Sequence, residues 1–505
     1  MLYISTRGNH EPVSASRAIL LGMVPSGGLF VPDSIPVLEE GQLRALQGQS
    51  YTGVAQQIVS PYLDDYSGAE IDACLACAYS SGNFSHPLIA PLYRLDDGIH
   101  LLELWHGPTA AFKDMALQLM PHLLSRALGK EGQRDELVIL VATSGDTGKA
   151  ALEGFSDVPG IRIIVFYPHG GVSRVQELQM TTTSGANTSV VAVRGNFDDC
   201  QGAVKDVFSD RELEQCLKKK GFTLSSANSI NWGRLLPQIV YYFWAWLQLT
   251  QGEGERGATL ERVNIVVPTG NFGNILAAWY AWRMGLPVKK LICASNENRV
   301  LTDFFQTGIY DSNREFRRTS SPSMDILISG NLERLLFAVS GSDGERTQGW
   351  MDELKKTGVF QVDAATRQAL DRIIYAGWAG ERETMKTIRE TFTKYDYLLD
   401  THTAVGLSVY EQYRAATADN TPAIIAATAS PFKFSASVLA ALRGDDMWLQ
   451  DLDEFSILTE LSRLSGVSVH PALQDLQGKT VRHRLVCGKG EISQKIMEIL
   501  KYQGR

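Results

Sequence analysis

The chain has 505 residues, of which 44% are hydrophobic and 21% are charged, and its net charge is −8. These proportions are ordinary for a globular protein of several domains. The negative charge and the lack of a basic stripe argue against a nucleic-acid or membrane-surface partner. Residues 1–8 lack the basic-then-apolar order of a secretory leader, and six cysteines are too few for a disulfide framework at this length. We therefore expect a reduced, cytoplasmic protein.

The sequence offers no metal site. Cys74 and Cys77 form one C-x-x-C pair, but there is no second pair, and the nine histidines are scattered without ligand spacing. We expect two thiols in a helical core and no bound metal. The longest apolar run, residues 239–249, is about half a membrane span and predicts a buried helix.

Residues 1–95 are expected to form a separate N-terminal extension. Glycine and proline punctuate residues 22–36, and helical patterning follows at 43–63 and 71–79. A strand-like run at 99–104 comes next, and Gly107-Pro108 ends it.

Lys113 is the unusual residue of the stretch that follows. A helix is predicted to start near Ala111, which places Lys113 in its first turn beside Phe112. Desolvation there would lower the pKa of the lysine and leave a neutral amine, which imine formation with a carbonyl cofactor requires. A surface lysine whose stem covers Phe112 is the plainer interpretation, and this stretch alone favours it.

The rest of the chain alternates buried strands with helices, which predicts parallel sheets built from βαβ units. Pro121 is expected to kink the helix after Lys113, and Phe208 is expected to face inward. We predict an α/β fold with two doubly wound parallel-sheet domains. Residues 136–236 would form the smaller domain, and 96–135 with 237–505 the larger one. The predicted strands are 137–142, 161–167, 189–193, 264–267, 288–294 and 423–427, and a long helix spans 232–249.

Two glycine-containing turns connect a strand to a helix and present free backbone N–H groups to an anion. They are residues 143–149 and 270–274. The first is not a Walker A loop, because Ala150 stands where serine or threonine must bind magnesium. Neither has the G-x-G-x-x-G dinucleotide spacing. One such turn is usually only a tight connection, but two of them with a buried lysine favour a phosphate-bearing cofactor.

Residues 106–114, with Lys113, closely resemble the cofactor-lysine motif of the threonine synthases. These are pyridoxal-phosphate enzymes of fold type II, the fold of the tryptophan synthase β subunit. The resemblance runs in order from residue 3 to about 434. It implies that Lys113 binds the cofactor as an imine and that Thr428 faces the pyridine nitrogen. The other implied cofactor residues are Gly270, Asn271, Phe272, Gly273 and Asn274, and the implied substrate residues are Ser144, Gly145, Asp146, Thr147, Asn228, Ser229 and Arg234.

The resemblance implies a carbon–oxygen lyase that converts O-phospho-L-homoserine and water to L-threonine and phosphate by β,γ-elimination and replacement. This is the last step of threonine biosynthesis. The expected partner is this small molecule, and the expected assembly is a monomer or homodimer. Many relatives have histidine at the position of Ser430, so the role of that residue stays open. The alternatives are a threonine-synthase-like phospholyase that releases a 2-keto acid, which Thr428 disfavours, and an inactive protein that only binds phosphorylated metabolites.

Overall fold

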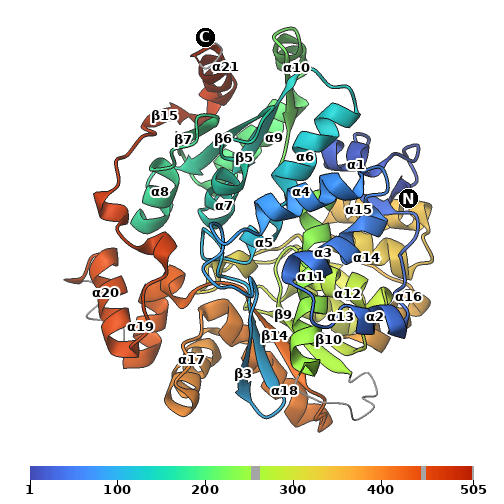
Figure 1. Ribbon diagram of the computed structural model, residues 1–505, viewed down its shortest axis with the longest axis vertical. Coiled ribbons are helices and arrows are strands. Elements are labelled where there is room, and N and C mark those ends of the chain that lie inside the picture. Colours follow the sequence, from blue (N-terminus) through green and yellow to red (C-terminus); the bar gives the residue numbers. More distant parts are fainter. Residues whose placement is uncertain (252–261, 445–450, 503–505) are drawn as a thin grey trace.

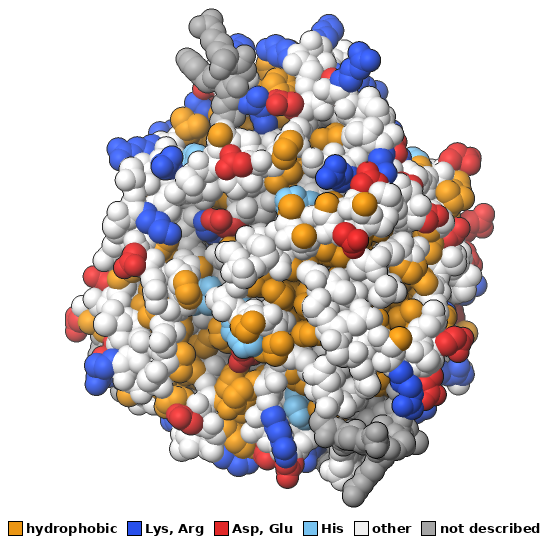
Figure 2. Space-filling model, viewed as in Figure 1, with side chains coloured by type: hydrophobic (Ala, Val, Ile, Leu, Met, Phe, Trp, Pro, Cys, Tyr) orange, Lys and Arg blue, Asp and Glu red, His pale blue; other side chains and the backbone are white. Residues whose placement is uncertain are grey.

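The computed structural model describes residues 1–251, 262–444 and 451–502. Two sheets with covering helices lie one above the other in Figure 1, and an N-terminal layer of helices packs beside them. Acidic and basic side chains are interspersed over the face seen in Figure 2, and hydrophobic side chains gather near its centre. Among the described residues, no helix is both long and apolar enough to cross a membrane.

The N-terminal layer is mostly helical and packs against the long helix α11 (Trp232–Thr250). The expected helical patterning is confirmed, but only Cys74 is buried, because Cys77 lies on the exposed face of its helix. The layer consists of β1 (Tyr3–Ser5), α1 (Ala15–Leu21), β2 (Phe30–Pro32), α2 (Glu40–Ala45), α3 (Tyr51–Val59) and α4 (Gly68–Ala78), and β1 pairs with β2 antiparallel.

The larger sheet has six strands, and all neighbours are parallel except β3, which pairs antiparallel with β4. The predicted strands here are confirmed, and β14 has the bounds expected from the sequence. The strand order is β13 (Ile374–Trp378), β10 (Val288–Ser295), β9 (Val263–Pro268), β14 (Ala423–Ala427), β4 (Ile99–Glu103) and β3 (Leu92–Asp96).

Helices cover both faces of this sheet, as a doubly wound fold requires. Ile265 and Val267 of β9 pack on the side of α11 and α12 (Gly273–Arg283), whereas Val266 packs on the side of α18 (Thr401–Thr417). The other helices and short strands of this part are α13 (Val300–Thr307), β11 (Ile309–Asp311), α14 (Leu332–Val339), α15 (Gly344–Thr357), β12 (Val359–Gln361), α16 (Ala364–Ile373), α17 (Glu381–Tyr395), α19 (Ser435–Arg443) and α20 (Glu454–Ser465).

The smaller sheet has five parallel strands, again with helices on both faces. Its order is β15 (Leu485–Gly488), β7 (Thr188–Arg194), β6 (Ile161–Pro168), β5 (Glu136–Ala142) and β8 (Phe222–Ser225). Its helices are α7 (Asp146–Phe155), α8 (Arg174–Thr181), α9 (Phe197–Ser209), α10 (Arg211–Lys218) and α21 (Ile492–Tyr502).

Three local expectations need correction. The C-terminal β15 and α21 lie beside β7 and α9 in the smaller unit, so the tail is not wholly part of the larger domain (Figure 1). Pro121 does not kink a helix, because α5 (Lys113–Leu117) ends before it and a new helix, α6 (Met120–Lys130), begins. Pro121 lies in the first turn of α6, where an N–H group has no partner inside the helix and its absence costs nothing. Phe208 is 41% exposed.

Candidate active site

The predicted site residues lie on loops at the carboxyl ends of parallel strands. In the larger sheet β9 and β14 are neighbours, with β10 and β13 on one side of the pair and β4 and β3 on the other. In the smaller sheet β6 and β7 lie on one side of β5, and β8 lies on the other. Such switch points leave a crevice where ligands bind in open α/β sheets. The loops after β4, β5, β9 and β14 carry most of the predicted residues.

The lysine loop, residues 107–114, is a tight structure closed by a buried carboxylate. Asp114 accepts hydrogen bonds from the backbone N–H of Thr109 at 2.9 Å and from its hydroxyl at 2.7 Å. A side chain on Gly107 would meet Asp114 at 2.5 Å, which explains the glycine. Burial raises the pKa of Asp114 to about 6, although the two Thr109 donors favour its ionised form. Lys113 then opens α5, as predicted.

Backbone hydrogen bonds join this loop to the segment after β14. The Phe112 N–H donates to the Thr428 carbonyl at 2.8 Å, and the Ser430 N–H donates to the Ala110 carbonyl at 3.0 Å. Thr428 is therefore held beside the lysine loop. Its side chain is buried, and its hydroxyl makes no hydrogen bond to another described residue. The hydroxyl is thus free for a ligand and does not cap the strand end.

Lys113 belongs to a buried charge cluster with Asp146 and Lys433. The Asp146 carboxylate lies 3.7 Å from the Lys113 Nζ and 2.9 Å from the Lys433 Nζ. Lys433 also donates to the Thr109 carbonyl at 2.9 Å, and Gln176 donates to Asp146 at 3.1 Å. These contacts hold the cluster between the two sheets.

Burial lowers the pKa of Lys113 below its ordinary value; Lys433 and Arg234 add to this effect, and Asp146 opposes it. Burial alone would raise the pKa of Asp146, but Lys433 and Lys113 hold it well below its ordinary range. The cluster therefore joins a fixed carboxylate to an amine that loses its proton more readily than an ordinary lysine.

The loop after β9 ends at the N-terminus of α12, whose first turn has N–H groups without partners inside the helix. The residue with positive φ is Phe272, at 62°, and not Gly273. The Phe272 ring is buried against Phe305 at 5.8 Å, and this packing holds the conformation. Gly270 is required for close approach, because a side chain there would lie 2.5 Å from the Ser323 carbonyl oxygen.

The two asparagine side chains of this loop form hydrogen bonds with neighbouring segments of the protein. The Asn271 amide contacts the Ser229 hydroxyl and accepts the Gly330 N–H at 2.5 Å. The Asn274 carbonyl oxygen accepts the Tyr241 hydroxyl at 2.6 Å. The backbone N–H groups of the loop are therefore the groups left to bind an anion.

Arg234 is a buried guanidinium in the first turn of α11. It is 5% exposed and donates to the Ala227 carbonyl at 2.9 Å, but it forms no ion pair within the described residues and its Nε has no partner. Burial lowers the pKa of Arg234 to about 10. An unpaired buried cation is costly unless a ligand neutralises it, so this side chain indicates an anion site near Lys113.

The turn after β5 is built around Gly145. The Thr143 hydroxyl accepts the N–H groups of Gly145 and Gly148, at 3.0 and 2.9 Å. Gly145 has φ 136°, and a side chain there would overlap Gln176. Ser144 is exposed and Thr147 is half-buried beside it. Asn228 is likewise exposed, and its side chain accepts from the Ser229 hydroxyl at 3.2 Å. Within the described residues, none of these three side chains forms a hydrogen bond or ion pair with Lys113, Asp146 or Lys433.

Sequence reasoning missed Lys433, Gln176, Ser323 and His402. Lys433 had a usable signal, because it lies between two phenylalanines five residues after Thr428, much as Lys113 follows Phe112. The other three come from segments whose approach depends on packing between distant elements.

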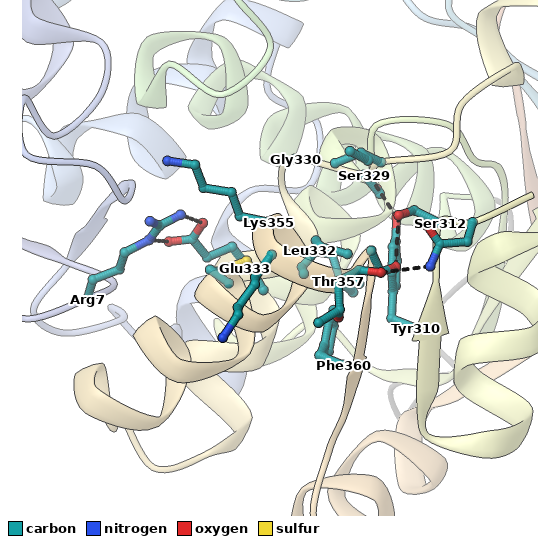
Figure 3. Close-up of a pocket in the computed structure, with 16 residues that line it drawn as sticks. Arg7, Tyr310, Ser312, Ser329, Gly330, Leu332, Glu333, Lys355, Thr357 and Phe360 are labelled. Atoms are coloured by element: carbon teal, nitrogen blue, oxygen red, sulfur yellow. Dashed lines mark hydrogen bonds and ion pairs between the residues drawn. The ribbon is translucent and has the colours of Figure 1, made fainter.

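A cavity of about 650 Å³ lies beside this site and not in it. In Figure 3 Arg7 faces Glu333 on one side, and Tyr310 and Phe360 lie on the other. Its lining includes none of the predicted site residues. It shares only a wall with the site, because Ser329 donates to the Gly270 carbonyl at 3.0 Å.

These features fit pyridoxal phosphate. The α12 N-terminus offers donors for a phosphate, Lys113 offers an amine of lowered pKa, and Thr428 offers a free hydroxyl beside the lysine loop. The cradle is narrow, since Gly270 has no room for a side chain.

Comparison with known families agrees with this arrangement. The profile described as "Threonine synthase N terminus" matches residues 2–79, and "Pyridoxal-phosphate dependent enzyme" matches residues 86–427. "Threonine synthase, C-terminal" matches residues 403–471. Together these matches extend over most of the chain.

Similar proteins include threonine synthases from Schizosaccharomyces pombe, 38% identical over 87% of this chain and 89% of the relative, and from Pseudomonas aeruginosa, 39% identical over 87% and 90%. Human threonine synthase-like 1 is 40% identical over 94% of this chain, which spans 64% of that longer protein.

Solved structures agree with the sequence relatives. Threonine synthase from Brucella melitensis, with pyridoxal phosphate bound, matches with a TM-score of 0.88, 37% identity and full coverage of both chains. The yeast enzyme matches with a TM-score of 0.87 and 32% identity over 99% of each chain. This chain therefore belongs to the threonine synthase family of pyridoxal-phosphate-dependent enzymes.

Proposed function

We propose that this protein is a threonine synthase that converts O-phospho-L-homoserine and water to L-threonine and phosphate. The observation that carries the proposal is the charge cluster around Lys113, whose amine contacts Ser323 beside the α12 loop and lies near enough to Arg234 for that cation to lower its pKa. The amine, the cofactor cradle and a second anion site are thus arranged in one crevice.

The bound cofactor would supply an electron sink, and the protein would supply orientation, proton transfer and electrostatics. Lys113 would be the Schiff-base lysine of a fold-type-II site. The residues that would hold the cofactor are Lys113, Thr428 and the loop Gly270, Asn271, Phe272, Gly273 and Asn274.

Lys113 would also act as the general base that moves protons at the α- and β-carbons of the substrate. Its lowered pKa favours the neutral amine that this role needs. Lys433 supports this role, because it lowers the pKa of Lys113 further and pairs with Asp146, whose carboxylate 3.7 Å from the amine opposes the lowering.

Arg234 would bind the substrate phosphate with Asn228 and Ser229. Ser229 contacts Asn271, so the two anion sites are adjacent. Ser144, Gly145, Asp146 and Thr147, at the N-terminus of α7, would bind the amino-acid end of the substrate. Water must be excluded until phosphate has left, which closure of the two sheet units over the substrate would achieve.

A phospholyase that releases a 2-keto acid is the second candidate. The free hydroxyl of Thr428 favours the synthase, because a neutral partner leaves the pyridine nitrogen a weaker sink than a charged partner would. We further propose a cytoplasmic enzyme that is a monomer or homodimer.

The test is incubation of the protein with pyridoxal phosphate and O-phospho-L-homoserine, followed by product identification. We expect a yellow protein that forms threonine and phosphate in equal amounts. Lys113→Ala should lose both colour and turnover and keep its circular dichroism spectrum. Keto acid as the main product would favour the phospholyase, and binding without turnover would favour a non-catalytic protein.

A further inference from the structure

We propose that His402 is a positioning residue for Lys113 and that it acts by fixing Ser323. The proposal rests on the proposed function, in which Lys113 is the reactive amine. His402 and Ser323 are far apart in the sequence, and each reaches the site from a different element.

His402 is a fully buried residue in the first turn of α18, and both its ring nitrogens are occupied. Its Nδ1 lies 3.0 Å from a carboxylate oxygen of Asp400, the N-cap of that helix. Its Nε2 accepts the backbone N–H of Ser323 at 3.1 Å. Because Nε2 is an acceptor, Nδ1 must carry the proton and donate it to Asp400, so these two bonds define one neutral tautomer and one ring orientation.

Ser323 lies on a short helical turn, residues 322–324, that forms one wall of the site. Its hydroxyl lies 3.4 Å from the Lys113 Nζ. Its carbonyl oxygen occupies the space that a side chain on Gly270 would need. Ser323 therefore contacts the amine with one group and the phosphate loop with another, and its N–H is the group that His402 holds.

A serine hydroxyl can accept a hydrogen bond from a charged amine and donate one to a neutral amine. Ser323 can therefore orient Lys113 in both protonation states that a general base passes through. This contact is already 3.4 Å long, so a small displacement of the turn would break it. Ser323 is exposed, so the packing of its own side chain does not prevent such a displacement.

Nearby polar groups hold both ends of the segment. Asp325 accepts from the Asn296 amide at 2.8 Å and from the Asn298 amide at 2.9 Å. The Thr401 hydroxyl donates to the Ser320 carbonyl at 2.8 Å. Within the described residues, the bond to His402 is the one hydrogen bond that the Ser323 backbone makes to another element.

A matched pair of substitutions separates positioning from simple packing. In His402→Gln the side-chain oxygen can replace Nε2 and still accept the Ser323 N–H. In His402→Asn the shorter amide can replace Nδ1 and still bond to Asp400, but it cannot reach Ser323. Both variants keep a buried polar side chain, so they should have similar melting temperatures.

The measurements use the cofactor-loaded enzyme. We expect His402→Asn to lower kcat about three- to ten-fold with little change in KM, the effect of one lost hydrogen bond, and His402→Gln to restore most of the activity. We also expect His402→Asn, but not His402→Gln, to shift the pH titration of the visible absorbance of the bound cofactor, because the environment of the Lys113 nitrogen changes.

A double-mutant cycle with Ser323→Ala tests the route of the effect. If His402 acts through the Ser323 hydroxyl, adding His402→Asn to Ser323→Ala should cost less than about two-fold beyond the single variant. The proposal would be overturned if the losses of kcat from His402→Asn and Ser323→Ala multiplied in the double variant. It would also be overturned if His402→Asn and His402→Gln had equal activity, or if His402→Asn left the absorbance titration unchanged. Wild-type protein that binds no cofactor or forms no threonine would instead refute the proposed function.

Discussion

Arg234 and Arg334 are both buried, but Arg334 has more hydrogen-bond acceptors than Arg234. This difference gives the most informative prediction. Arg334 is fully buried and donates to the carbonyls of Phe30 at 3.0 Å and Ile230 at 2.6 Å and to the Asn331 side chain at 2.5 Å. Within the described residues Arg234 donates to one acceptor, the Ala227 carbonyl, and its Nε has no partner. We consider Arg234→Met and Arg334→Met, which keep most of the volume and remove the charge.

The two changes should affect stability very differently. Arg334→Met leaves three buried acceptors without a donor, at about 1–3 kcal/mol each, so we expect a loss of roughly 3 kcal/mol or more. Both changes also remove a buried cation that forms no ion pair within the described residues, so the lost hydrogen bonds set the contrast. Arg234→Met loses one such bond, and its free energy of unfolding should stay within about 1 kcal/mol of wild type.

Catalysis should show the reverse order among folded proteins. A hydrogen bond to a charged phosphate contributes about 1.5–3 kcal/mol, so Arg234→Met should lower kcat/KM for O-phosphohomoserine roughly ten- to a hundred-fold or more. Inorganic phosphate should raise the melting temperature of the cofactor-loaded wild type, by linkage, and should not raise that of the variant. An unchanged kcat/KM, or a phosphate shift that persists in Arg234→Met, would remove Arg234 from the site.

The remaining predictions test other parts of the site. Gly270→Ala should weaken cofactor retention because its Cβ would lie 2.5 Å from the Ser323 carbonyl oxygen, whereas Gly273→Ala, with its nearest neighbour at 3.4 Å, should retain the cofactor; equal retention would contradict this. Folding lowers the pKa of Lys113 below its ordinary 10.5, so the unfolded chain takes up this proton at a higher pH than the folded protein does. The cofactor-free wild type should therefore lose stability relative to Lys113→Met as the pH falls from about 10 through the lowered pKa. Parallel plots of unfolding free energy against pH for the two proteins would refute this. Thr428→Ala should keep the cofactor and lose activity, and Thr428→Asp should raise the ratio of keto acid to threonine; parental rates and ratios in both would show that Thr428 does not contact the ring.

Much of the fold could be predicted because buried parallel strands are continuous apolar runs. β14 has the expected bounds, and Lys113 opens a helix beyond the end of β4 as expected. The glycine turns after β5 and β9 also lie where the pattern places them. In each case the signal is local, because strand, turn and helix start all fall within about ten residues.

What could not be predicted depends on contacts between distant segments. The positive φ of the phosphate loop is at Phe272, because burial of its ring against Phe305 outweighs the usual preference for glycine. Helical spacing alone could not show that Phe208 lies outside the packed face of α9. Lys433 and His402 reach the site only through packing of the C-terminal half on the lysine loop.

The C-terminal position of β15 has a consequence for synthesis. The other strands of the smaller sheet end by residue 225, but β15, which covers the edge of β7, begins at residue 485. At about 5–20 residues per second, translation of the residues between them takes on the order of ten to fifty seconds. During this time the nascent chain carries a parallel sheet with the unpaired edge of β7 open to other chains. Ribosome-bound chaperones are expected to matter most in this interval, and removing the last twenty-one residues, which include all of β15, would make the exposed edge permanent.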